Sequence, residues 1–148
     1  MANNPDLSPS GPLEFLRVEG ELPIVTIPDE TTVIYEWSQP NPRFVQELAE
    51  ARPPFIYRPS HFLKKLHSKY ADEESLRAAL REKRVRSWAA LHNKSDNRYK
   101  FDNAELPTLH PWMLATKDAK TRFLFVRNPF YHRVDSAGTQ LPYIDVVE

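Results

Sequence analysis

The stretch TRFLFVR, residues 121–127, decides the fold that this sequence predicts. Its central residues, Phe123 to Val126, are apolar on both alternating faces, which is typical of a strand in the middle of a sheet. After it, residues 131–134 and 141–147 predict a hairpin, in which Gly138 takes a positive φ angle because it has no side chain. The C-terminal part of the chain is therefore expected to be mainly strand.

A second group of strands is predicted near the N-terminus. Residues 24–27 and 33–35 are rich in β-branched and aromatic side chains, and the turn signal at 28–30 separates them. They predict a local hairpin. Residues 1–12 hold three prolines among small polar residues and are expected to form a mobile tail, so that one domain covers residues 13–148.

The middle third predicts three helices. Asn41 can cap a helix over residues 42–51, Ser60 one over 61–70, and Asp72 a third that begins at residue 73. The apolar stripe of the third helix shifts by five residues, which predicts a bend near Lys83 and Arg84. Residues 55–57 are expected to be an edge strand or an extended connector, and the stretch beyond residue 94 mainly a loop. Together these elements predict an α+β fold with a mixed or antiparallel sheet made of N- and C-terminal strands.

Composition excludes several classes of protein. The chain has 148 residues, no cysteine and only three glycines, which excludes a disulfide framework, a thiol nucleophile and a glycine-rich phosphate loop. No run of about 18 apolar residues and no signal-peptide pattern is present, and the five histidines form no metal-binding motif. We therefore expect a soluble protein of the cytoplasm or nucleus, without membrane association, metal or cofactor.

Charge is distributed unevenly along the chain, although the net charge is zero. Residues 1–50 carry two basic and nine acidic side chains, whereas residues 61–100 carry eleven basic and five acidic ones. The order of segments around the basic region is similar to that of a winged helix, which implies a helix in a DNA groove. The leading hypothesis is a non-enzymatic module that binds a polyanion, most readily nucleic acid, through residues 61–100. Its predicted contacts are Lys64, Lys65, Lys69, Arg77, Arg81, Arg84 and Arg86.

Two alternatives stay open. A small transferase or hydrolase could use a His/Arg/Tyr pocket, because histidines beside aromatic rings can have shifted pKa values; the candidate catalytic residues are His110, His132, Arg58 and Arg133. An adaptor or homo-oligomer could instead use a surface formed by Trp37, Trp112, Phe130 and Tyr143, because aromatic residues are enriched at protein interfaces.

Overall fold

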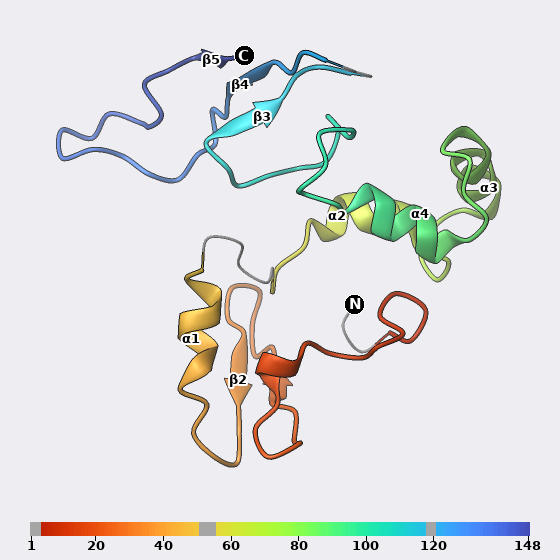
Figure 1. Ribbon diagram of the computed structural model, residues 1–148, viewed down its shortest axis with the longest axis vertical. Coiled ribbons are helices and arrows are strands. Elements are labelled where there is room, and N and C mark those ends of the chain that lie inside the picture. Colours follow the sequence, from red (N-terminus) through yellow and green to blue (C-terminus); the bar gives the residue numbers. More distant parts are fainter. Residues whose placement is uncertain (1–3, 51–55, 118–120) are drawn as a thin grey trace. The chain divides into compact units, whose positions relative to one another are not determined.

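The computed structural model describes residues 4–50, 56–117 and 121–148. They belong to two compact units, Met1–Arg58 and Pro59–Glu148, and each unit has its own small antiparallel sheet (Figure 1). Strands near both ends of the chain and helices between them confirm the predicted α+β class, with the strands divided between two sheets. The prediction of a mobile tail at 1–12 and one domain over 13–148 stays a prediction.

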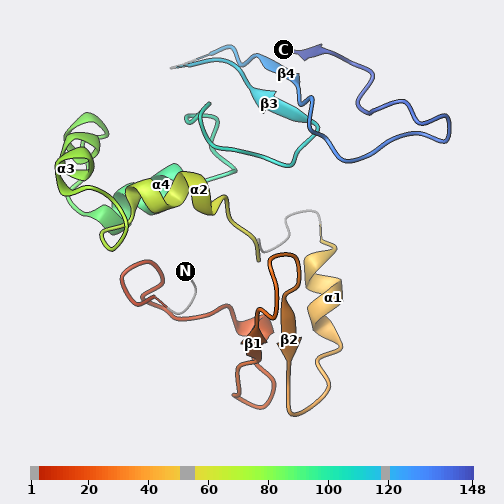
Figure 2. The same cartoon turned by 180° about the vertical axis from the view of Figure 1, so that it is seen from behind.

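The first unit is built around a hairpin of two short strands, β1 (Ile24–Thr26) and β2 (Ile34–Glu36), which lie side by side in Figure 2. Val25 stands opposite Tyr35 in an antiparallel register, so the predicted hairpin is confirmed. In the connecting turn, the Asp29 carboxylate accepts hydrogen bonds from the backbone N–H and the hydroxyl of Thr31, at 2.8 and 3.0 Å. An aspartate that bonds its own backbone two residues on is a common way to fix a tight turn.

One face of this hairpin packs against an aromatic cluster. Phe44, in helix α1 (Arg43–Leu48), places its ring centroid 5.2 Å from that of Tyr35 and 4.8 Å from that of Trp37. Phe15, in the 3₁₀ helix η1 (Glu14–Leu16), stacks on Phe44 from a centroid distance of 6.3 Å. Aromatic pairs at such separations add to the stabilisation from buried area, so this cluster holds η1 and α1 on the hairpin.

Asn41 has a different role from the one predicted. Its Nδ2 donates to the carbonyl oxygen of Phe15 at 3.0 Å, and helix α1 begins after Pro42 without a side-chain cap. The proline fixes φ in the helical range and so starts the helix in place of a cap. The asparagine thereby ties the start of α1 to η1.

The other face of the hairpin, here called the outer hairpin face, consists of Ile24, Thr26, Ile34 and Glu36. Ile24 is 69% exposed and Ile34 is 45% exposed. An isolated two-stranded hairpin is only marginally stable in water. The contacts of the aromatic cluster on the opposite face therefore account for much of its stability.

The second unit begins with helices. Helix α2 (Ser60–Leu63) continues into the 3₁₀ helix η2 (Lys64–Leu66), and α3 (Glu73–Glu82) and α4 (Trp88–Ser95) follow. The predicted cap of α3 is confirmed, because Asp72 accepts from the backbone N–H of Ser75 at 2.9 Å. The predicted bend is a complete break between two helices. Arg84 has a φ angle of 52° there, and a left-handed residue cannot continue a right-handed helix.

The sheet of the second unit has three strands in the order β3 (Trp112–Leu114), β4 (Phe125–Arg127) and β5 (Val146–Val147). Its central strand is β4, as TRFLFVR predicts, although only the last three residues of that stretch are strand. Strand β3 lies in a region predicted to be mainly loop. Its three residues show no alternation of their own and become a strand by pairing with β4.

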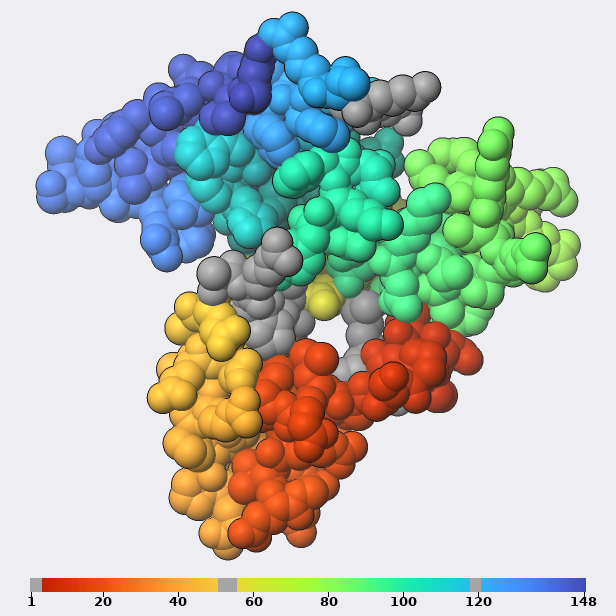
Figure 3. All heavy atoms as spheres, in the orientation of Figure 1, coloured from red at the N-terminus to blue at the C-terminus, as the bar shows by residue number. Residues whose placement is uncertain are grey.

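Between β4 and β5 the chain forms a long excursion, which stands out from the sheet in the space-filling view (Figure 3). Its tip is organised by Asp135, whose carboxylate accepts from the backbone N–H groups of Ala137 and Thr139, each at 2.8 Å, and from the hydroxyl of Tyr143. These donors lower the pKa of Asp135, the Tyr143 hydroxyl most of all. Gly138 has the predicted positive φ angle of 82°. Of the predicted pairing of 131–134 with 141–147, the described residues show a hydrogen bond from the Leu141 N–H to the Arg133 carbonyl oxygen at 3.0 Å. Val134 bridges to Gln140, which lies outside the predicted range, and Val146 and Val147 pair with β4.

Buried apolar side chains are few. Among the described residues, only Leu7, Leu63 and Leu91 are apolar and buried, and no helix there is both long enough and apolar enough to cross a bilayer. The predicted element at 55–57 begins at a residue outside the described part, and Ile56 and Tyr57 belong to no strand. The second unit, which holds two of the three buried leucines, also contains the site described next.

Candidate functional site: an aromatic pocket in the second unit

The three-stranded sheet presents one mainly apolar face, on which Arg127 stands opposite Trp112. Leu114, Phe125 and Val147 stand opposite one another across the three strands, and Trp112 follows two residues before Leu114 on the same face. Directly paired residues share a face of an antiparallel sheet, and so do residues two apart along a strand. The sheet therefore supplies one apolar wall of a cavity.

The facing wall comes from the loop between α4 and β3. Phe101 packs its ring edge-on against Phe123 and Phe125, at centroid distances of 5.5 and 5.2 Å. Asn103 fixes the loop, because its Nδ2 donates to the carbonyl oxygen of Ser95 at 2.9 Å and its Oδ1 accepts from the backbone N–H of Glu105 at 3.3 Å. Side-chain bonds of this kind give an irregular loop a defined shape.

A buried asparagine joins the loop to the end of β4. Asn128 is 2% exposed, and its Nδ2 donates to the carbonyl oxygens of Thr108 at 3.2 Å and His110 at 2.9 Å. Its Oδ1 accepts from the backbone N–H of Phe130 at 3.0 Å. One side chain thus satisfies three backbone groups around a buried position, where an unsatisfied group would be costly.

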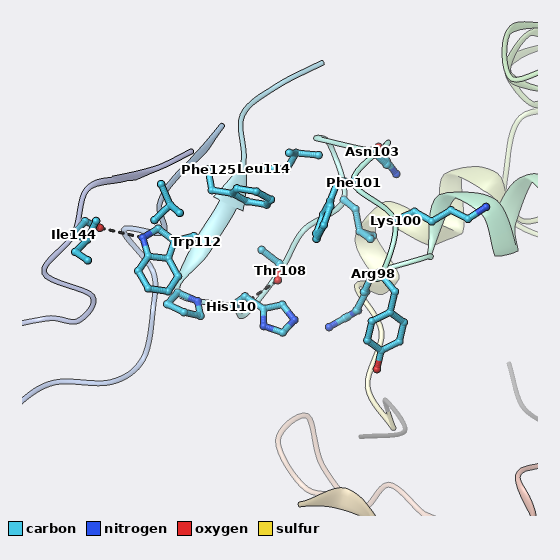
Figure 4. Close-up of a pocket in the computed structure, with 14 residues that line it drawn as sticks. Arg98, Lys100, Phe101, Asn103, Thr108, His110, Trp112, Leu114, Phe125 and Ile144 are labelled. Carbon is cyan, nitrogen blue, oxygen red and sulfur yellow. Dashed lines mark hydrogen bonds between the residues drawn. The ribbon is translucent and has the colours of Figure 1, made fainter. Parts of the chain in front are cut away.

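Between these walls lies a pocket of about 510 Å³ (Figure 4). The indole Nε1 of Trp112 donates to the carbonyl oxygen of Ile144 at 3.0 Å and so places the ring at one end of the pocket. Most of the lining is apolar or aromatic, and the described residues that line it are Arg98, Tyr99, Lys100, Phe101, Asn103, Leu106, Thr108, His110, Pro111, Trp112, Leu114, Phe125, Ile144 and Val147. Concave, mainly apolar pockets of this size with a few polar groups are typical of small-molecule sites.

His110 lines the pocket, and the pKa of its imidazole is lowered. Partial burial lowers the pKa of its imidazole, and the positive charge of Arg98 lowers it further. Both effects disfavour the imidazolium form, although part of the ring remains in contact with solvent. At neutral pH, His110 is therefore an uncharged hydrogen-bonding group in the pocket.

A stability measurement can check the state of His110. Because its pKa is lower in the folded chain than the ordinary 6.5, the unfolded chain binds more protons in the interval between the two pKa values. The contribution of His110 to the free energy of unfolding is complete above pH 6.5 and should be lost as the pH falls through that interval. Urea unfolding from pH 7.5 to 5 should give a steeper decline for the native chain than for His110→Gln. Parallel curves would mean that burial does not affect the imidazole.

Of the four catalytic candidates, His110 alone belongs to the lining of the described pocket. His110 lines the pocket, whereas Arg58 belongs to the first unit, where its guanidinium donates to the carbonyl oxygen of Tyr57. His132 and Arg133 lie in the excursion between β4 and β5 and do not line the pocket; the His132 ring packs on Tyr131 at a centroid distance of 4.9 Å. No group of three metal-ligating side chains occurs within residues 4–50, 56–117 and 121–148.

The basic residues of the nucleic-acid hypothesis lie on the helices and turns of the second unit, outside the pocket. Arg77 pairs with Glu73 one helical turn away, at 2.5 Å. Lys64 and Lys69 lie over the ring of Tyr70, at 5.8 and 5.5 Å from its centroid. Lys65 belongs to η2, Arg81 to α3, and Arg84 and Arg86 to the turn that precedes α4.

Several residues of the site were not predicted as such. Arg98, Asn103 and Asn128 were not proposed as site residues, because the contacts that give them a role join segments distant in sequence. Trp112 was proposed as part of an aromatic protein-binding surface, but its convergence with Tyr99 and Phe101 depends on the pairing of β3 with β4.

Known proteins similar to this chain include the following two. A periplasmic alpha-galactoside-binding protein of Rhizobium meliloti (strain 1021) is 30% identical over 118 residues, which are 79% of this chain and 14% of that protein. Among solved structures, an oligopeptide-binding protein OppA matches with a TM-score of 0.79 and 33% identity over 98% of this chain and 22% of that one. The chain thus spans about a seventh of the alpha-galactoside-binding protein and less than a quarter of the oligopeptide-binding protein. No protein-family model matches it.

These likenesses correct the predictions on function and location. By their names, the first of these proteins binds an alpha-galactoside and the second binds oligopeptides. The predicted nucleic-acid-binding function and nucleic-acid partner are therefore wrong. The relative from Rhizobium meliloti is periplasmic, which contradicts the predicted cytoplasmic or nuclear location. The physical reason lies in the charges, since a basic stretch with acidic residues one turn away forms local pairs, as Arg77 and Glu73 do.

Proposed function

We propose that this chain takes part in binding a small organic solute outside the cytoplasm, in the manner of a periplasmic binding protein. The observation that carries the proposal is the likeness to an oligopeptide-binding protein over nearly the whole chain, with a third of the residues identical. The alpha-galactoside-binding relative supports the same class of function, because it also binds a small solute.

The aromatic pocket supplies a site of suitable chemistry. Its volume of about 510 Å³ lies within the usual range for small-molecule sites, about 300 to 1,000 Å³. Trp112, Phe101 and Phe125 offer ring surfaces, and the polar groups are few. A solute with an apolar part would release water from these rings on binding, and this release favours association.

The test is a ligand screen against the full chain, by isothermal titration calorimetry and thermal unfolding. The probes are a set of short peptides with apolar residues, the α-galactoside melibiose, and a single-stranded oligonucleotide as the negative control. A ligand at 100 times its dissociation constant stabilises the folded chain by about 2.7 kcal/mol, which is easily measured. Binding of a peptide or the galactoside supports the proposal, and absence of binding to all of them removes it.

A matched pair of tyrosines shows whether binding uses the pocket. Tyr99 lines the pocket and is 54% exposed, whereas Tyr70 is 56% exposed and does not line it. Tyr99→Ala should weaken binding of the active ligand about fivefold, because ring contacts of this kind contribute about 1 kcal/mol, and Tyr70→Ala should leave it unchanged. Equal effects of the two changes would locate the binding elsewhere.

A further inference from the structure

The polar side chains that line the pocket are largely occupied by the chain itself. Both ends of the Asn103 amide are used, by Ser95 and Glu105. The Thr108 hydroxyl accepts from the backbone N–H of His110 at 3.0 Å, and the Thr108 carbonyl oxygen accepts from Asn128. A sugar presents many hydroxyl groups, each of which needs a partner when it leaves water. The described pocket offers few such partners.

The charged side chains of the pocket have one sign. Its described lining includes Arg98 and Lys100 and no aspartate or glutamate. Figure 4 shows the Arg98 side chain extending toward His110, whereas the Lys100 side chain extends away from Trp112 and Phe125. Arg98 is half-buried and Lys100 is exposed. The positive charge of Arg98 also acts on the pocket residue His110, because this charge helps to lower the pKa of the imidazole.

From this arrangement we infer that the pocket selects a small carboxylate with an apolar or aromatic group, with the carboxylate at Arg98 and the apolar group against Trp112, Phe101 and Phe125. The inference rests on the proposed solute-binding function and narrows it. A guanidinium binds a carboxylate through charge-assisted hydrogen bonds, and partial burial strengthens this pair relative to one in open water. The ligand is anionic at one end and apolar at the other.

The ligand comparison uses two matched pairs and one neutral sugar. The first pair is the dipeptide N-acetyl-Gly-Phe and its C-terminal amide, which differ only in the charge of the end group. The second is 3-phenylpropionate and its amide, which carry the same phenyl and end groups without a peptide bond. Melibiose is the sugar. Calorimetry at pH 7.5 should show each acid binding at least tenfold more tightly than its amide. Binding of both acids would indicate carboxylates in general, and binding of the dipeptide acid alone a peptide end.

Two cation changes then locate the carboxylate. Arg98→Gln should weaken binding of the acids about tenfold and leave binding of the amides unchanged, whereas Arg81→Gln, at an exposed residue of α3 outside the pocket lining, should change neither by more than about twofold. Arg98→Lys keeps the charge without the guanidinium geometry and should retain most of the preference for the acid. Circular dichroism of each variant shows whether it is folded. If Arg98→Gln does not fold, the Arg98→Lys variant is used to test the role of the guanidinium.

The outcomes separate this inference from the function on which it rests. Equal affinity for acids and amides, or equal effects of the two glutamine changes, overturns the carboxylate assignment while solute binding stands. Tight binding of melibiose without binding of the acids also overturns the carboxylate assignment, while solute binding stands. Absence of binding to every peptide, acid and sugar overturns both.

Discussion

Asn128→Asp is expected to lower the free energy of unfolding by about 3 kcal/mol, because it removes the donor of two hydrogen bonds at a position that is 2% exposed. In the native chain Nδ2 bonds the carbonyl oxygens of Thr108 and His110. An aspartate of the same shape would place an acceptor against these two acceptors and a negative charge away from water. Urea unfolding at pH 7.5 measures the loss.

The control for this change is Asn97→Asp. The Oδ1 of Asn97 accepts from the backbone N–H of Tyr99 at 3.0 Å, and an aspartate oxygen can accept the same bond. This variant should therefore unfold within about 0.5 kcal/mol of the native chain, because the half-buried Asn97 keeps its hydrogen bond. If both variants lost the same stability, the donated bonds of Asn128 would not be the cause, and the link between the loop and β4 would have to lie elsewhere.

Leu91→Ala should also lower the free energy of unfolding by about 3 kcal/mol, within the usual range of about 2 to 5 for a buried leucine. Leu91 lies in α4 and is 1% exposed, so truncation leaves a cavity where α4 contacts α3 and η2. Because few apolar side chains are buried among the described residues, each one that is buried contributes a large share of the stability.

Leu109→Ala makes the same chemical change at a residue that is 57% exposed. Its expected loss is below about 1 kcal/mol, because most of its surface stays in water in either state. Chemical denaturation of the two leucine variants under identical conditions gives the comparison. A loss at Leu91 no larger than that at Leu109 would mean that α4 does not form part of the core.

Elements whose signals are local could be predicted from the sequence. The β1–β2 hairpin follows from β-branched residues on both sides of a turn, the cap at Asp72 from its place before an amphipathic stretch, and the turn at Gly138 from its free φ angle. The central position of β4 follows from the apolar run at 123–126. In each case the residues that cause the structure lie within a few positions of it.

Elements that depend on distant partners could not be predicted. Strand β3 forms because Met113 meets Val126 across the sheet, and the role of Asn128 depends on carbonyl groups 18 and 20 residues away. Of the pocket, His110 was proposed as a functional residue, but as a catalytic one. The convergence of Arg98, Phe101 and Trp112 arises only when loop and sheet are assembled.

The outer hairpin face has a consequence for how the chain behaves in concentrated solution. Two copies that met through Ile24 and Ile34 would also bring together the carboxylates of Glu36, which stands opposite Ile24 on that face. The apolar residues favour such an encounter and the charges oppose it. Salt screens charges over about 10 Å at 0.1 M, so added salt weakens the repulsion and leaves the attraction. Association of two copies through the outer hairpin face is therefore expected to be weakest at low ionic strength.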